Sequence, residues 1–228
     1  MKKAFTLAEV LITLGIIGVV VALTLPVIVQ NHIKETTVKK IQQNFSLFEQ
    51  INKIGLIDNE TFYDWDASVD RGVIAENFVK EFLIPNTKIM KNCGFDRNGG
   101  CFPKKIYYLN GEELANSTNN ISQYLVLGNG TCIYLNAQTA SPEGGNLIAA
   151  VMDTNGFSGP NRVGRDIFEF KIGKDGIVTY KNAFNQSREY YLSQGRWYNC
   201  NKKAKYAGFS CINVIIQDGF KIGKGYPW

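Results

Sequence analysis

The feature that most constrains this chain is an apolar run without charged residues from Val10 to Val29. A helix rises about 1.5 Å per residue, so these twenty residues would span roughly 30 Å, the thickness of a bilayer core. A short cationic stretch, Met1 to Ala4, precedes the apolar residues, which begin at Phe5. The run therefore predicts a transmembrane helix.

A secretory signal peptide is the first alternative to a membrane span. Such a signal has an apolar stretch of about 7–15 residues and a small-x-small cleavage site. Here the run is longer, and Pro26 and further apolar residues follow it in place of such a site. A simple signal anchor remains a second alternative.

Glu9 is an acidic residue close to the start of this apolar segment. A charge at the centre of a membrane helix costs about 2.5–3.5 kcal/mol, and such residues usually have a partner. If the chain were cut before Phe5, the new α-amino group of a neighbouring copy, shifted along the helix axis, could reach the carboxylate. Glu9 thus suggests staggered assembly of parallel helices.

The segment from Lys2 to Ile12 resembles the class III signal of type IV pilins and type II secretion pseudopilins. In that family a basic leader ends in a small residue, and Phe, a glutamate four residues later and a long apolar helix follow. The resemblance covers residues 1 to about 30, and it implies that prepilin peptidase cuts between Ala4 and Phe5 and methylates the new amine. The usual residue before the cut is glycine, whereas this chain has Ala4.

The resemblance also implies an organisation of the chain. Residues 1–4 would be the leader, 5–29 a transmembrane and assembly helix, and 30–228 an extracytoplasmic domain that includes the soluble half of the helix. The protein would lie in the bacterial inner membrane as a single-pass protein and then in a pilus or pseudopilus. Its partners would be other pilin or pseudopilin subunits, prepilin peptidase, the inner-membrane assembly platform and membrane lipid.

Pro26 interrupts the backbone hydrogen bonding of any helix that contains it, so it either kinks the helix or marks the end of the membrane span. Beyond it, apolar residues recur at near-helical spacing and predict an amphipathic continuation that ends near Gly55. Its apolar positions are Ile33, Val38, Ile41, Phe45, Phe48 and Ile51.

The remaining residues predict an α+β fold. A second helix is expected from Val69 to Leu83, with Pro85 ending it. Alternating or apolar runs bounded by turn residues predict strands at 106–109, 123–127, 131–136, 147–152, 167–172 and 177–180. In pilins an antiparallel sheet packs on the soluble half of the long helix, and the resemblance implies the same pilin-like arrangement here.

The five cysteines fit an exported domain with two short disulfide loops. Cys93 would pair with Cys101 and Cys200 with Cys211, which leaves Cys132 unpaired and buried in a strand. Zinc is the competing interpretation, but zinc sites need closer spacing of the CxxC kind.

The segment from Asp153 to Asp166 is rich in Asp, Asn and Gly. Oxygen ligands on a glycine-bent loop suit calcium, and Asp153, Asn155 and Asp166 could converge on such an ion. It loosely resembles a loop that binds calcium in some pseudopilins. The alternative is a structural loop whose Asp and Asn side chains cap backbone N–H groups.

Composition argues against catalysis and against nucleic-acid binding. The net charge is +5 without a dense Lys/Arg block, and His32 is the one histidine. There is no phosphate-binding glycine motif, so we expect no enzymatic activity, although mechanisms that use carboxylates alone stay open. Several aromatic residues could bind a ligand or simply pack: Trp65, Trp197, Tyr198, Tyr226 and Trp228.

Two functions fit the sequence. The first is a structural subunit of a type IV pilus or type II secretion pseudopilus, assembled through its apolar helix with Glu9 paired to a neighbour's Phe5 amine. The alternative is a membrane-anchored extracytoplasmic binding domain, such as an adhesin or sensor, which does not assemble and does not need Glu9.

Overall fold

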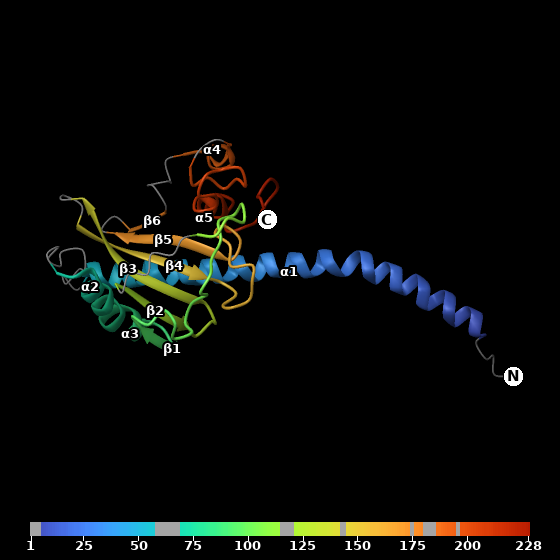
Figure 1. The fold of residues 1–228 in the computed structure, drawn as a ribbon, viewed down its shortest axis with the longest axis horizontal. Helices are drawn as coiled ribbons and strands as arrows, with labels where there is room; N and C mark the ends of the chain where they lie inside the picture. Colours follow the sequence, from blue (N-terminus) through green and yellow to red (C-terminus); the bar gives the residue numbers. More distant parts are fainter. Residues whose placement is uncertain are drawn as a thin grey trace. The chain divides into compact units, whose positions relative to one another are not determined.

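The computed structural model describes residues 6–57, 69–114, 121–141, 145–173, 176–179, 186–194 and 197–228. The chain divides into two compact units, residues 1–36 and residues 37–228. Helix α1 (Leu7–Ile57) begins in the first unit and ends in the second (Figure 1).

The described part of the first unit, residues 6–36, is Thr6 and the beginning of α1, which is apolar up to Val29. Its large apolar side chains are exposed from Leu7 to Val29. The helix continues through Pro26, and both a kink and the end of the membrane span at this residue stay predictions. Among the described residues, α1 is a helix long and apolar enough to cross a membrane. A signal sequence can have the same length and apolar composition.

The second unit contains the rest of α1, a six-stranded antiparallel sheet and several short helices. The helical elements after α1 are α2 (Arg71–Phe78), the π-helix η1 (Val79–Leu83), α3 (Ile84–Asn86), α4 (Arg188–Leu192) and α5 (Cys211–Gln217). The strands are β1 (Ile89–Gly94), β2 (Ser122–Leu127), β3 (Cys132–Ser141), β4 (Gly145–Asp153), β5 (Ile167–Gly173) and β6 (Gly176–Thr179). The strands pair in chain order, β1 to β6.

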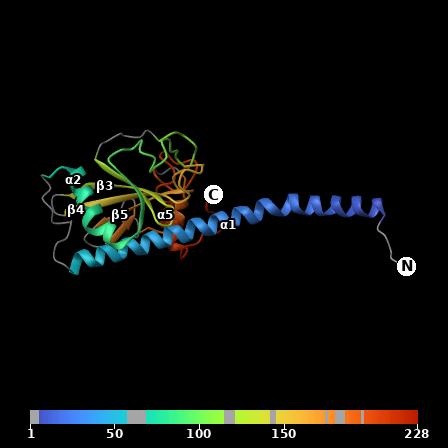
Figure 2. The same ribbon diagram turned by 90° about the horizontal axis from the view of Figure 1, so that it is seen from below.

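One face of the sheet forms the main core with α1. Along β5 the side chains alternate, so that Phe168, Phe170 and Ile172 face the main cluster while Glu169 points to the other side. Phe48 of α1 packs edge-on against Phe170 with ring centroids 5.2 Å apart. Figures 1 and 2 show this part of α1 running along the sheet.

A second, smaller cluster lies on the opposite face. Tyr124, Cys132 and Val151 of the sheet contact residues of the 101–106 and 163–167 segments. The described segments that cover this face are therefore loops. They include part of the Cys93–Cys101 loop and of the Asp/Gly segment, both discussed below.

The α+β class with an antiparallel sheet is confirmed, and the differences lie in particular segments. The helix predicted from Val69 to Leu83 begins at Arg71 and continues through Pro85 to Asn86. Pro85 falls in the first turn of α3, where the N–H donor that proline lacks is tolerated. The strand predicted at 106–109 is wrong: there Tyr107 makes only isolated bridges to Glu113 and Arg162. Strand β1 and helices α4 and α5 were not expected.

The contact between α1 and β5 predicts a large loss of stability when Phe48 is truncated. Phe48 is fully buried, so Phe48→Ala removes a large side chain that its neighbours cannot replace and should lower the free energy of unfolding by about 3–5 kcal/mol. Chemical denaturation of the detergent-solubilised chain would measure it. The control is Ile57→Ala, 76% exposed on the same helix, which should change stability by less than about 0.5 kcal/mol.

Candidate functional site

The predicted assembly residue, Glu9, has a hydrogen-bond partner within its own chain. Its Oε2 accepts hydrogen bonds from the backbone N and the Oγ1 of Thr6, each 2.8 Å long. The N–H of Glu9 in turn donates to Thr6 Oγ1 at 3.3 Å. These reciprocal bonds form a capping box at the start of α1, a Thr-x-x-Glu pattern that was readable in the sequence.

The processing residues Ala4 and Phe5 lie outside the described residues, as does the whole predicted leader. The described side-chain contacts of Glu9 are therefore those to Thr6. Both described hydrogen bonds of the Glu9 carboxylate use Oε2, so Oε1 has no hydrogen-bond donor among the described residues. One oxygen of the carboxylate is thus left for a donor from elsewhere.

The Asp/Gly segment connects β4 to β5, and the carboxylate of Asp166 organises its turn. Asp166 Oδ2 accepts from the backbone N of Asn161 at 2.8 Å and from Asn155 Nδ2 at 3.3 Å. Asp166 Oδ1 accepts from the backbone N of Arg162. The three predicted calcium ligands are therefore close together, since Asp153 Oδ1 also accepts from the N–H of Asn155.

Helix α1 is joined to this segment by polar contacts. Lys40 Nζ donates to the carbonyl of Thr154 at 2.7 Å. One turn further along, the side chain of Asn44 donates to Thr131 Oγ1 at 3.1 Å and accepts from Asn129 Nδ2 at 3.1 Å. These side chains fix the β2–β3 turn and the Asp/Gly segment to the same stretch of helix.

Burial perturbs the acidic groups of the segment strongly. Desolvation, and next the charge of Asp166, raise the pKa of Asp153 from 3.8 to about 8, although Lys40 acts in the opposite direction. Burial also raises the pKa of Asp166. The neighbouring thiol of Cys132 is buried, and desolvation raises its pKa to about 11, so it is not a reactive thiolate near neutral pH.

The fit of a calcium ion to this segment is mixed. Three buried oxygens have no hydrogen-bond partner in the part of the chain that the structure describes and could face a cation: Asp153 Oδ2, Asn155 Oδ1 and Asn161 Oδ1. Against this, the carboxylate oxygens of Asp166 already accept N–H donors, and the ammonium of Lys40 lies beside the site. No cluster of three or more His, Cys, Asp or Glu side chains able to hold a metal occurs among the described residues. The contacts favour the structural role.

The structure pairs Cys93 with Cys101 and Cys200 with Cys211, the two pairs that the spacing predicts. Cys132 is free and buried. The first disulfide closes the loop after β1, and the second joins the segment that precedes α5 to the first residue of that helix.

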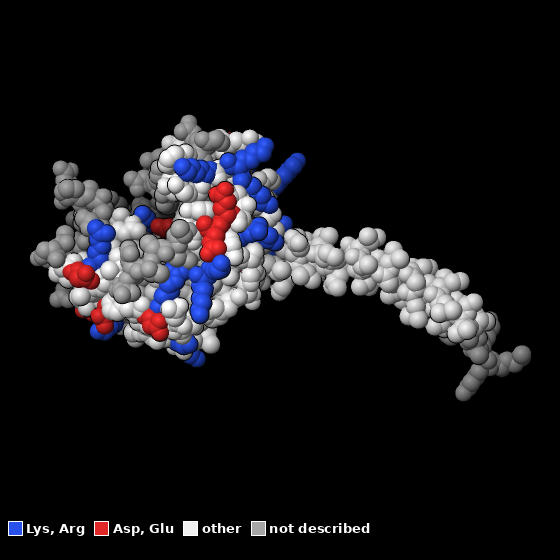
Figure 3. Space-filling model, in the orientation of Figure 1, with Lys and Arg blue, Asp and Glu red and all other residues white. Residues whose placement is uncertain are grey.

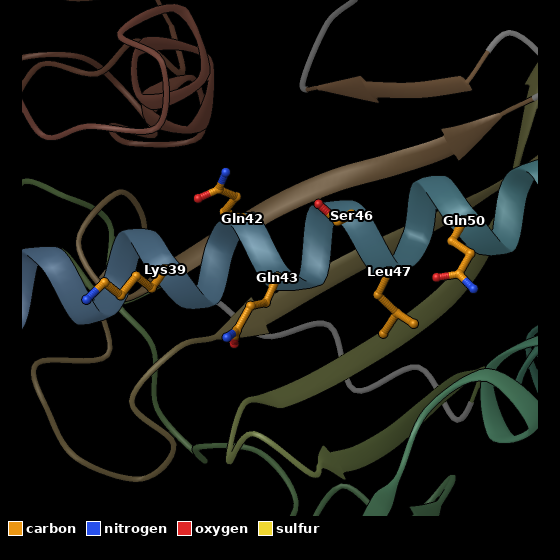
Figure 4. Close-up of a pocket in the computed structure, with 6 residues that line it drawn as sticks. All are labelled: Lys39, Gln42, Gln43, Ser46, Leu47 and Gln50. Carbon is orange, nitrogen blue, oxygen red and sulfur yellow. The ribbon is translucent and has the colours of Figure 1, made fainter.

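A shallow groove of about 530 Å³ lies on the exposed side of α1 (Figure 4). Five of its six lining residues are polar, and all come from one helix: Lys39, Gln42, Gln43, Ser46, Leu47 and Gln50. A groove of this kind has neither the apolar enclosure nor the converging polar groups typical of a small-molecule site.

Comparison with known proteins gives no relative: no family model, no curated protein and no solved structure matches the chain.

The buried Asp153 predicts an unusual dependence of stability on pH. Its pKa is about 8 in the folded protein and near 3.8 when the side chain is exposed, so between these values the folded state binds more protons than the unfolded state. The stability of the protein should therefore fall as the pH rises from about 4 to about 8. In Asp153→Asn this fall should become smaller, as measured by melting temperature across that range. Exposed Asp96→Asn should leave it unchanged, and an equal fall in both variants would contradict the assignment.

The two roles considered for Asp166 predict different responses to calcium. If Asp166 caps backbone N–H groups, Asp166→Ala should lower the free energy of unfolding by about 1–3 kcal/mol, whether calcium or a chelator is present. We expect this result and no calcium-dependent rise of the wild-type melting temperature. A rise at millimolar calcium that Asp166→Ala abolishes would instead assign a bound ion.

Proposed function

We propose that the chain is a pilin-like structural subunit, inserted in the inner membrane and assembled through its N-terminal helix into a type IV pilus or type II secretion pseudopilus. The observation that carries the proposal is the combination of an exposed, uncharged apolar helix with a carboxylate at its beginning. It is supported by the resemblance of residues 1 to about 30 to the prepilin signal.

The apolar part of α1 needs a non-aqueous partner. Between Leu7 and Val29 the large apolar side chains are exposed on every side of the helix, a far larger apolar surface than a soluble monomer leaves open. Lipid would cover this surface before assembly, and the helices of neighbouring subunits would cover it afterwards.

Glu9 serves two roles in this proposal. In the single subunit its Oε2 closes the capping box with Thr6. In the assembled filament Oε1 would accept the α-amino group of Phe5 of a neighbouring, processed subunit. A carboxylate with one capped and one open oxygen can keep the helix start intact while it pairs with that amine.

The second candidate function is a membrane-anchored extracytoplasmic binding domain that does not assemble. The capping box is the observation that favours this second function, because the box explains the presence of Glu9 without a neighbouring subunit. In that case the carboxylate matters only through the hydrogen bonds that it makes to Thr6.

Two substitutions separate these functions. Thr6→Ala removes the Oγ1 of the capping box and keeps the carboxylate, whereas Glu9→Gln keeps a capping acceptor and removes the charge. We expect Glu9→Gln to reduce the amount of sheared or cross-linked filament at least about tenfold, because an unpaired ammonium among apolar helices is costly. Thr6→Ala should assemble within about twofold of the wild type.

Filament yield is compared at equal membrane levels of each variant, and N-terminal mass spectrometry of the extracted protein provides the second measurement. A chain that begins at methylated Phe5 is expected. Retention of Met1 to Ala4, or equal assembly of Glu9→Gln and the wild type, would contradict the proposal and favour the anchored binding domain.

A further inference from the structure

A cluster of five aromatic rings lies at the C-terminal side of the domain, outside both sites described above. Three chain segments contribute to it: Tyr108, then Trp197 and Tyr198, then Tyr206 and Phe209. Tyr198 and Tyr206 stack with centroids 5.2 Å apart and planes inclined by 25°. Trp197 stands edge-on to Tyr206 at 5.8 Å and 82°. The indole and the tyrosine thus meet at nearly a right angle.

Trp197 is the open ring of the cluster. Its side chain is 58% exposed, while Tyr198 and Tyr206 are half-buried and stack on each other. Trp197 and Tyr206 form the two sides of what we call the corner. Lys205 places its Nζ over both rings, 4.6 Å from the Trp197 centroid and 5.2 Å from that of Tyr206. The ammonium thus lies over the indole ring itself, and a ligand on Trp197 would be in its immediate vicinity.

The segment that carries this corner holds most of the net charge of the protein. Residues 197–228 contain five lysines and one acidic residue, Asp218. Asp218 pairs with Arg188 at 2.6 Å, and no carboxylate among the described residues lies within 4.0 Å of any of the five lysines. Figure 3 shows Lys and Arg side chains over the part of the domain that holds α4 and α5, with Asp and Glu side chains next to them. These five lysines therefore form no close ion pair among the described residues.

The backbone around the corner is fixed before any ligand arrives. Tyr198 donates its N–H to the carbonyl of Lys205 and accepts the N–H of Ser210, at 2.8 and 2.9 Å. The Cys200–Cys211 disulfide closes the same loop. Tyr198 and Tyr206 have φ values of 68° and 57°, which bulky L-residues rarely adopt, so the surrounding structure holds both rings in place. A fixed corner loses little conformational entropy on binding.

We propose that the corner formed by Trp197, Tyr206 and Lys205 is a binding site for an acidic polysaccharide, with a sugar ring on the indole and its carboxylate on Lys205. The C–H groups on the face of a pyranose carry partial positive charge and suit the negative face of an indole. A carboxylate on the same sugar would neutralise Lys205, which forms no ion pair with a described carboxylate. Lys202 and Lys203, both exposed, would attract the next anionic residues of the polymer.

A single-stranded nucleic acid carries the same charge but fits this corner less well. Proteins that bind it place successive bases on several open aromatic faces. Here the two tyrosines stack on each other, and among the described residues Trp197 is the ring of the cluster left largely open. One open ring beside several lysines matches a repeating acidic sugar better than a run of stacked bases.

The test is isothermal titration calorimetry with the full chain in detergent micelles and an oligogalacturonate as the acidic glycan. We expect Trp197→Ala to weaken binding at least about tenfold, as for truncation of a central aromatic residue, and Lys205→Gln at least about threefold. The matched controls are Phe157→Ala, which truncates an aromatic residue that is 57% exposed elsewhere, and Lys53→Gln on α1. Both controls should stay within about twofold of the wild type.

Melting curves establish that each variant is folded, and Trp197→Phe, which keeps a stacking ring, should recover part of the affinity. A neutral dextran oligomer should bind at least about tenfold more weakly than the oligogalacturonate, because it lacks the carboxylates. Several results would overturn the proposal: no binding of the acidic glycan, equal losses in the control variants, or binding that Trp197→Ala leaves unchanged. Tighter binding of oligothymidylate would also overturn it and assign a nucleic-acid surface. The calorimetric titration does not measure assembly through α1. The proposal of glycan binding and the proposal of filament assembly can therefore fail independently of each other.

Discussion

The domain depends on the apolar contact between α1 and one face of the sheet. A sheet with one apolar face must bury that face against another layer, and the part of α1 that begins at Thr37 supplies it. Phe48 and its neighbours interlock with Phe170, while α2 extends the same layer beside β2 and β3. The polar residues Lys40 and Asn44 border this contact, so the helix that closes the core also holds two of the connections between strands.

The helix has two kinds of surface along its length, and the sequence reveals the change. Before Val29 apolar residues surround the helix, as expected for a segment in lipid or among other helices. After Thr37 the buried positions follow a stripe that includes Val38, Ile41, Phe48 and Ile51, as expected for one side against a core. The amphipathic half was therefore predictable down to individual residues, apart from Ile33, which is 45% exposed.

Other segments could not be read from local pattern because tertiary contacts decide them. The run Cys211–Gln217 is rich in β-branched residues and would suit a strand, yet it forms α5, whose first residue is held by the disulfide to Cys200. Strand β1 has no alternating pattern, since it is an edge strand with two irregularities in its pairing. Of the candidate sites, the cysteine pairs followed from spacing, and the turn around Asp166 from its Asp, Asn and Gly content. The link from Lys40 to Thr154 crosses 114 positions and has no local signal.

The strand order has a consequence for how the chain reaches this structure. Each strand pairs with its neighbour in sequence, so every ladder can form as soon as the next strand emerges. The layer that covers the sheet, in contrast, comes from the beginning of the chain. If the polypeptide crosses a membrane, the second half of α1 would thus be exported before the strands. Strands β1 to β6 could then pack onto this helix one after another.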